Sequence, residues 1–164
     1  MEKFKKGKMD YRNTLFVYYQ CLVCGIITKK EFLDYIDKQI EILDNPPLIY
    51  IDIAFLSSKR IDDIIRVLKS FLLEENIDIN SFNLGVLSVL KNKYTQKEIT
   101  LKEGVRYLYE LSREFDLPDD PEELYLMGDL DDELCLHKLD INIKGILEIE
   151  YDFEKILDLG ENIL

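Results

Sequence analysis

The sequence predicts an all-α fold: a compact bundle of about seven or eight short helices that forms one domain over residues 1–164. Two observations support this prediction. Apolar residues recur at a spacing of three and four along nearly the whole chain, which is the period of amphipathic helices. Helix start signals precede several of these stretches. The sequence contains no βαβ pattern and no glycine-rich phosphate loop, and no internal repeat of fixed period is evident.

The first two helices are predicted from their end signals. Helical spacing covers about residues 10–24, and Gly25 then offers the left-handed conformation that stops a helix. Thr28 and Glu31 have the spacing of a capping box, so a second helix should begin there and continue toward Pro46.

In the segment from Leu48 to Ser57, strand and helix compete. Isoleucines alternate at positions 49, 51 and 53, which suits a strand. The segment is short, follows a proline and stands among helices, so a short helix is the favoured interpretation.

Serine and threonine residues predict the starts of the next three helices. Ser58 is the expected cap of a helix that ends near Glu75, and Ser81 is the expected cap of the following one. Thr100 and Glu103 form a second capping box, which should open the helix after that.

The predicted closing helices lie in the C-terminal third. Asp120, Pro121 and Glu123 supply a cap, a first-turn proline and an early acid for one helix, which Gly128 is expected to divide. The last helix is predicted over about residues 146–159.

Charge is distributed unevenly along the chain. The 33 Asp and Glu outnumber the 21 Lys and Arg, which gives a formal net charge of −12. Residues 1–109 hold 17 basic and 15 acidic side chains, whereas residues 110–164 hold 4 and 18. This negative excess opposes binding to nucleic acid or to anionic lipid, because both need a cationic face.

The acidic run between Arg113 and Lys138 contains no basic residue. It has two interpretations: a solvated face that keeps the protein soluble, or a docking surface for a basic protein partner. On the second interpretation, the candidate partner-binding residues are Asp116, Asp119, Asp120, Glu122, Glu123, Tyr125, Asp129, Asp131, Asp132 and Glu133.

No catalytic, cofactor-binding or metal-binding residue is assigned. Cys21 and Cys24 match a bare C-x-x-C pattern, and Cys135 with His137 would complete a zinc set, but all four stand in apolar helical sequence. His137 is the sole histidine and falls near a predicted helix C-terminus, where the helix dipole explains it without catalysis. An enzyme is therefore not expected.

The N-terminal region superficially resembles a secretion signal. Lys3, Lys5, Lys6 and Lys8 precede an apolar stretch from Leu15 to Ile27. Polar residues interrupt that stretch, no small-residue cleavage site follows, and about 13 residues are too few to span a bilayer. We expect a cytoplasmic protein whose cysteines are reduced, with no membrane-spanning segment.

Three stretches carry a family resemblance: LVCGIITKKEFLDYIDKQIEILDNPPLIYIDIAFLSS (22–58), LYELSREFDLPDDPEELYLMGDLDDE (108–133) and NIKGILEIEYDFEKIL (142–157). In the first, a helix ends at glycine, an Ile-Thr cap with Glu opens the next helix, and a proline leads into a short apolar-acidic helix. The chain thus resembles the small helical immunity proteins of polymorphic-toxin and contact-dependent growth-inhibition systems. The resemblance implies a noncatalytic, cytoplasmic antagonist of a cognate basic toxin domain, often a nuclease.

Two other classes remain open. A helical adaptor or regulatory module would present an exposed apolar groove, and a small enzyme would need a concave pocket around His137 or a carboxylate pair. The identity of the toxin and the oligomeric state are not predicted.

Overall fold

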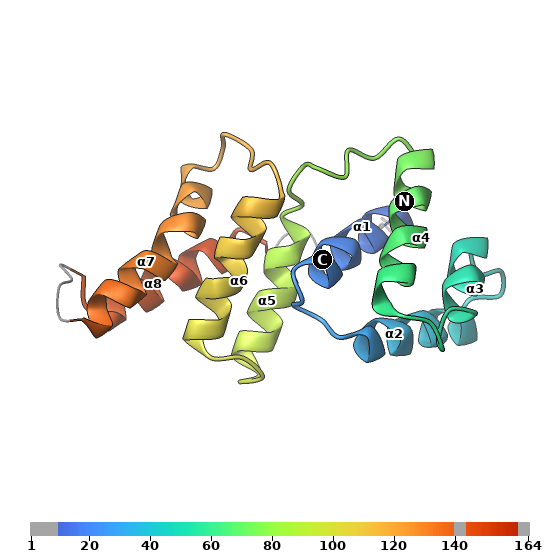
Figure 1. Ribbon diagram of the computed structural model, residues 1–164, viewed down its shortest axis with the longest axis horizontal. Coiled ribbons are helices and arrows are strands. Elements are labelled where there is room, and N and C mark those ends of the chain that lie inside the picture. Colours follow the sequence, from blue (N-terminus) through green and yellow to red (C-terminus); the bar gives the residue numbers. More distant parts are fainter. Residues whose placement is uncertain (1–9, 140–143, 161–164) are drawn as a thin grey trace, which may run out of the picture.

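The fold is all-α, as predicted (Figure 1). The computed structural model describes residues 10–139 and 144–160, so the lysines at positions 3–8 and Asn142 lie outside the described residues. Within the described ranges, β-structure is limited to an isolated bridge between Ser81 and Asp116. The helices are α1 (Tyr11–Val23), α2 (Lys29–Ile42), α3 (Leu48–Ala54), α4 (Ile61–Glu74), α5 (Gly85–Thr95), α6 (Leu101–Glu114), the 3-10 helix η1 (Glu122–Tyr125), α7 (Leu126–Lys138) and α8 (Ile146–Asp158).

Both predicted capping boxes are confirmed. The hydroxyl of Thr28 accepts a hydrogen bond from the backbone N–H of Glu31 at 3.1 Å, and the Glu31 carboxylate accepts one from the N–H of Thr28 at 2.6 Å. Thr100 and Glu103 make the same reciprocal pair at 3.2 and 2.7 Å. These bonds satisfy backbone donors that a helix N-terminus otherwise leaves unpaired.

The other predictions for the first half also hold. Gly25 has a φ of 70°, the left-handed conformation that ends α1. The ambiguous segment after Pro47 forms α3 and not a strand. Ile49 and Ile53 of α3 are buried, while Ile51 is half-buried.

Two predicted serine caps are wrong. The N-cap of α4 is Arg60, so Ser58 lies before the helix begins. Ser81 does not start α5, whose first residue is Gly85. The Ser81 hydroxyl donates to the carbonyl of Asp78 at 2.7 Å, and the backbone around it pairs with residue 116 instead of starting a helix.

The acidic segment after residue 120 is divided, but not at the predicted position. Its first turn is the 3-10 helix η1, for which Pro121 is the N-cap, and α7 then begins at Leu126. Gly128 lies inside α7, where its helix continues uninterrupted to Lys138.

The helices of the two halves are paired in the same way, although the sequence shows no repeat of fixed period. In the first half, α1 packs against α4 and α2 against α3; in the second, α5 packs against α8 and α6 against α7. The capping boxes of α2 and α6 are separated by 72 positions (28 to 100, 31 to 103), and so are the left-handed residues Gly25 and Lys97. The two halves, which lie side by side in Figure 1, therefore share one helical plan.

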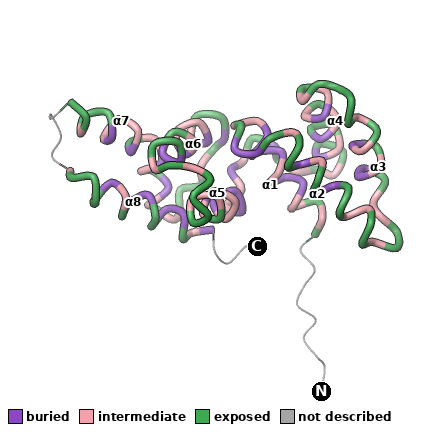
Figure 2. The backbone as a smooth tube through the Cα atoms, turned by 90° about the horizontal axis from the view of Figure 1, so that it is seen from below, coloured by how far each residue is buried: buried purple, intermediate pink, exposed green. Residues whose placement is uncertain are grey.

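A single hydrophobic cluster runs through both halves (Figure 2). Its largest fully buried side chains include Phe32 and Tyr50 from the first half and Phe153 from the second. The halves meet where α1 packs against α5. This shared core fixes the two halves relative to each other and leaves α3 and α7 at opposite ends (Figure 1).

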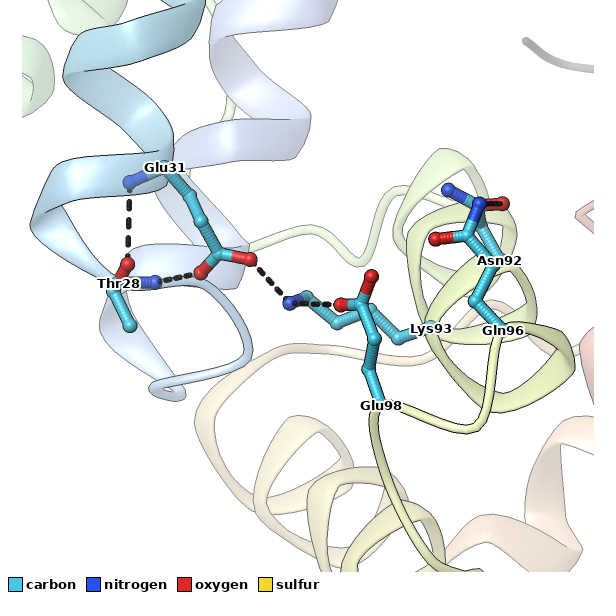
Figure 3. A network of polar contacts seen from close by, with 6 residues as sticks. All are labelled: Thr28, Glu31, Asn92, Lys93, Gln96 and Glu98. Atoms are coloured by element: carbon cyan, nitrogen blue, oxygen red, sulfur yellow. Dashed lines mark hydrogen bonds and ion pairs between the residues drawn. The ribbon is translucent and has the colours of Figure 1, made fainter.

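Polar contacts reinforce the junction (Figure 3). Lys93 of α5 donates to Glu31 of α2 at 2.5 Å and to Glu98 at 3.1 Å. Gln20 of α1 is fully buried and bonds to the backbone of Ser81 and Asn83 just before α5. Charged and amide groups thus join segments that lie far apart in the sequence.

Candidate protein-binding surface

The η1–α7 segment carries most of the predicted partner-binding residues. One side of this segment is buried: Leu124, Met127, Leu130 and Leu134 belong to the core. That side packs against α6 and α8. The apolar spacing of three and four residues therefore fixes which side of the segment faces solvent.

The opposite side of the segment forms an exposed stripe, here called the α7 stripe, which consists of Tyr125, Asp129, Asp132 and Leu136. These residues are spaced by four, three and four positions, so they lie on one helix face. All four side chains are exposed, Tyr125 to 57% and Leu136 to 41%. The stripe combines two carboxylates with an aromatic and an aliphatic side chain.

Most carboxylates of the acidic segment have no cationic partner. Among the residues that the structure describes, no Lys, Arg or His forms an ion pair with the following eight: Asp116, Asp119, Asp120, Glu122, Glu123, Asp129, Asp131 and Asp132. Six of them are exposed; Glu123 and Asp131 are half-buried. Their charges are therefore available to a cationic partner.

Tyr125 is positioned by one of these acids. Its hydroxyl donates a hydrogen bond to Oδ1 of Asp119 at 3.3 Å. The charge of Asp119 raises the pKa of Tyr125, because it disfavours a second negative charge beside it. An exposed tyrosine held in place beside carboxylates has the chemistry of an interface anchor.

Glu133 has a different environment from the other predicted residues. Its carboxylate is half-buried and accepts hydrogen bonds from Lys144 at 3.0 and 3.2 Å. Lys144 also donates to Asp152 of α8 at 2.9 Å. Because its charge is already neutralised within the chain, Glu133 contributes to the contact between α7 and α8, and we leave it out of the binding surface.

The sulfur and imidazole groups are dispersed over two helices. Cys21 lies on α1 and Cys24 is its C-cap, and burial raises the pKa of both thiols, that of Cys24 to about 12. Cys135 and His137 lie on α7, Cys135 exposed and His137 half-buried. Within the described residues, no three His, Cys, Asp or Glu side chains form a group that could hold a metal ion.

The sequence predicts the carboxylates and Tyr125 as candidates but gives no prediction for Leu136, which lies on the same exposed face. The available signal was its register: Leu136 follows Asp132 by four positions and so falls on the exposed face. Leu139, three positions further on at the C-cap of α7, is 66% exposed. Two exposed leucines therefore continue the surface beyond its last aspartate, at the C-terminal end of α7.

Comparison of the chain with protein-family models, with curated proteins and with solved structures gives no match. In the described residues, no helix is both long enough and apolar enough to cross a bilayer.

Proposed function

We propose that this chain is a noncatalytic immunity protein that binds and neutralises a basic toxin domain, a nuclease, through the α7 stripe and the unpaired carboxylates beside it. The observation that carries the proposal is the combination of exposed acids without cationic partners and exposed apolar anchors on one helix face. The proposal also implies that the protein acts in the cytoplasm, where the nuclease would otherwise cleave nucleic acids.

The chemistry of a nuclease supports this choice of partner. A nuclease must present cationic side chains to the phosphates of its substrate. Asp129 and Asp132 offer carboxylates that replace those phosphates, and the wider acidic segment accelerates the encounter of the two proteins. Tyr125 and Leu136 supply the apolar contact that long-range electrostatics alone does not give.

The experiment uses the C-terminal domain of the protein encoded immediately upstream of this chain as the probe. Binding is measured by calorimetry with the full chain and with the double variant Asp129→Lys/Asp132→Lys. We expect the variant to bind about 10–100-fold more weakly and with a smaller dependence on salt, because like charges then face the basic partner. Co-expression should protect cells from the domain only with the unmodified chain.

The matched control is Asp37→Lys/Glu41→Lys on the exposed surface of α2, which changes the net charge by the same amount. This control should bind as the unmodified chain does. Equal weakening by both double variants would show that only net charge matters, and absence of binding by the unmodified chain would overturn the proposal.

A second candidate function is that of a helical adaptor. The observation that favours it is an open groove between α3 and α4, at the other end of the molecule. Its lining is mostly apolar, as a peptide-binding module requires.

A further inference from the structure

The short helix α3 leaves one complete face without a partner. Ile49, Tyr50 and Ile53 are buried on its inner side. Leu48 and Phe55 point to the outer side and are 73% and 79% exposed. They stand seven positions apart, with the exposed Asp52 between them, so the outer side of this segment carries two large apolar side chains and one carboxylate.

A groove adjoins this face. It has a volume of about 490 Å³ and lies between α3, α4 and the start of α1. Its apolar lining consists of Tyr11, Pro47, Leu48, Ile49, Val67 and Phe71. A row of side chains from a helix fits such a groove, because a helix places apolar residues every three or four positions along one side.

The charged lining of the groove is mainly acidic. It consists of Asp52, Glu74 and Glu75 with a single base, Arg66. Glu75 pairs with Arg12 at 2.9 Å, and Arg66 pairs with Asp63 at 3.4 Å. Asp52 and Glu74 are exposed and form no ion pair with any described residue.

The position of Glu74 adds to the negative potential. Glu74 is the last residue of α4, where the helix dipole already places partial negative charge. A carboxylate there is unfavourable in isolation. A cation from a partner would offset both the dipole and the carboxylate.

The outer face of α3 has the same register as the α7 stripe. Leu48, Asp52 and Phe55 are spaced by four and three positions, as are Tyr125, Asp129 and Asp132. Both segments follow the second helix of their half. The third helix of each half thus presents aspartate beside exposed apolar side chains.

We propose that the α3–α4 groove docks an amphipathic, cationic helix of a protein partner. Apolar side chains of that helix enter the groove beside Leu48 and cover Phe55, and its Lys or Arg side chains pair with Asp52 and Glu74. The site shares no residue with the α7 stripe, and it lies at the opposite end of the molecule (Figure 1). The two sites can therefore be tested separately.

The test measures fluorescence anisotropy of a labelled 18-residue helical peptide, of about five turns, with leucine on one face and lysine on the other, titrated with the full chain. Leu48→Ser and Phe55→Ser should each weaken binding about tenfold, because each removes an apolar anchor. Asp52→Lys/Glu74→Lys should weaken it further and reduce its salt dependence. These four positions are exposed, so the variants should retain the fold.

The matched control is Leu147→Ser on α8, where the leucine is 75% exposed. It should bind the peptide as the unmodified chain does. Absence of saturable binding, or equal binding by all variants, overturns the proposal. So does preference for a peptide in which glutamate replaces lysine. A dimer in sedimentation analysis that Leu48→Ser dissociates would also overturn it, since the groove would then hold a second copy of the chain.

Discussion

Lys93 in α5 forms an ion pair with Glu31 in α2, with 2.5 Å between Nζ and Oε1, across the junction of the two halves. The lysine side chain is only 12% exposed and also contacts Glu98 at 3.1 Å. Glu31 has a second role, since its other oxygen closes the capping box of α2. One carboxylate thus stabilises both a helix N-terminus and the contact between the halves.

Replacing Lys93 by methionine should lower the free energy of unfolding by about 1–2 kcal/mol. The substitution keeps the aliphatic volume but leaves two neighbouring carboxylates without a cation. Urea denaturation measures the change. Lys69→Met is the control, because Lys69 is exposed on α4 and forms no ion pair within the described residues; a loss of the same size there would contradict the prediction.

The Glu31 carboxylate should make the free energy of unfolding depend on pH. Burial alone would raise the pKa of Glu31, but hydrogen bonds from Lys93 and Thr28 outweigh that effect and lower it. Ionised Glu31 therefore stabilises the fold above its unfolded pKa, and this contribution is lost as pH falls through the folded pKa. The glutamine variant Glu31→Gln keeps the capping group and lacks the charge.

Urea midpoints at several pH values test this dependence. The unmodified protein should be more stable than Glu31→Gln at neutral pH, and the difference should shrink as pH falls through the lowered folded pKa of Glu31 and vanish below it. Glu41→Gln is the control: Glu41 is exposed on α2 and forms no ion pair with any described residue, so its replacement should leave the pH dependence of stability unchanged. A difference in stability between the unmodified protein and Glu31→Gln that stayed constant across pH would refute the stabilising role of the Glu31 charge.

The helix starts that sequence predicts correctly depend on local contacts. Thr28 with Glu31 and Thr100 with Glu103 need no information beyond three positions. Ser81 fails as a cap because Phe82 donates its N–H to the carbonyl of Asp116, a partner distant in sequence. Local patterns do not reveal such pairings.

The similar helix pairing of the two halves is not visible in the sequence, for a related reason. The two halves share the pairing of their helices and the positions of some turns, but the residues at matching positions differ. Position 104 of α6 follows position 32 of α2 by 72 residues, the separation of the two capping boxes, and holds glycine where α2 has phenylalanine. The acidic surface was predictable because uncompensated charge must face solvent. The pairing of Glu133 with Lys144 was not, because Lys144 lies beyond the acidic run.

Gly104 makes room for Phe153 of α8. A Cβ built at position 104 would approach Cε2 of the Phe153 ring to 2.9 Å, and that ring is fully buried. Gly104→Ala should therefore destabilise the protein by about 1–3 kcal/mol, although alanine favours a helix. Thermal or urea denaturation measures the loss.

Gly128→Ala in α7 is the matched comparison. A Cβ there meets only the hydroxyl of Ser112 at 3.6 Å, an ordinary contact. Alanine should therefore stabilise the protein by up to about 1 kcal/mol through helix propensity. If Gly104→Ala and Gly128→Ala changed stability in the same direction, packing against Phe153 would not explain the glycine.

Gln20 connects α1 to the segment that leads into α5. Its amide nitrogen donates to the carbonyl of Ser81 at 2.6 Å, and its oxygen accepts from the N–H of Asn83 at 2.9 Å. The side chain is fully buried, so Gln20→Leu would leave both backbone groups without partners. We expect a loss of about 1–3 kcal/mol in the free energy of unfolding.

Amide hydrogen exchange distinguishes this loss from a general packing defect. In Gln20→Leu the N–H of Asn83 should exchange faster than it does in the unmodified protein, because its acceptor is removed. The amides inside α1 should keep their protection, because the helix remains. Gln96→Leu is the control, since the exposed side chain of Gln96 donates to Asn92 one turn earlier and holds no distant segment of the described chain. If Gln20→Leu changed stability by less than about 0.5 kcal/mol, water would be replacing both hydrogen bonds and the segment before α5 would be held by its apolar contacts alone.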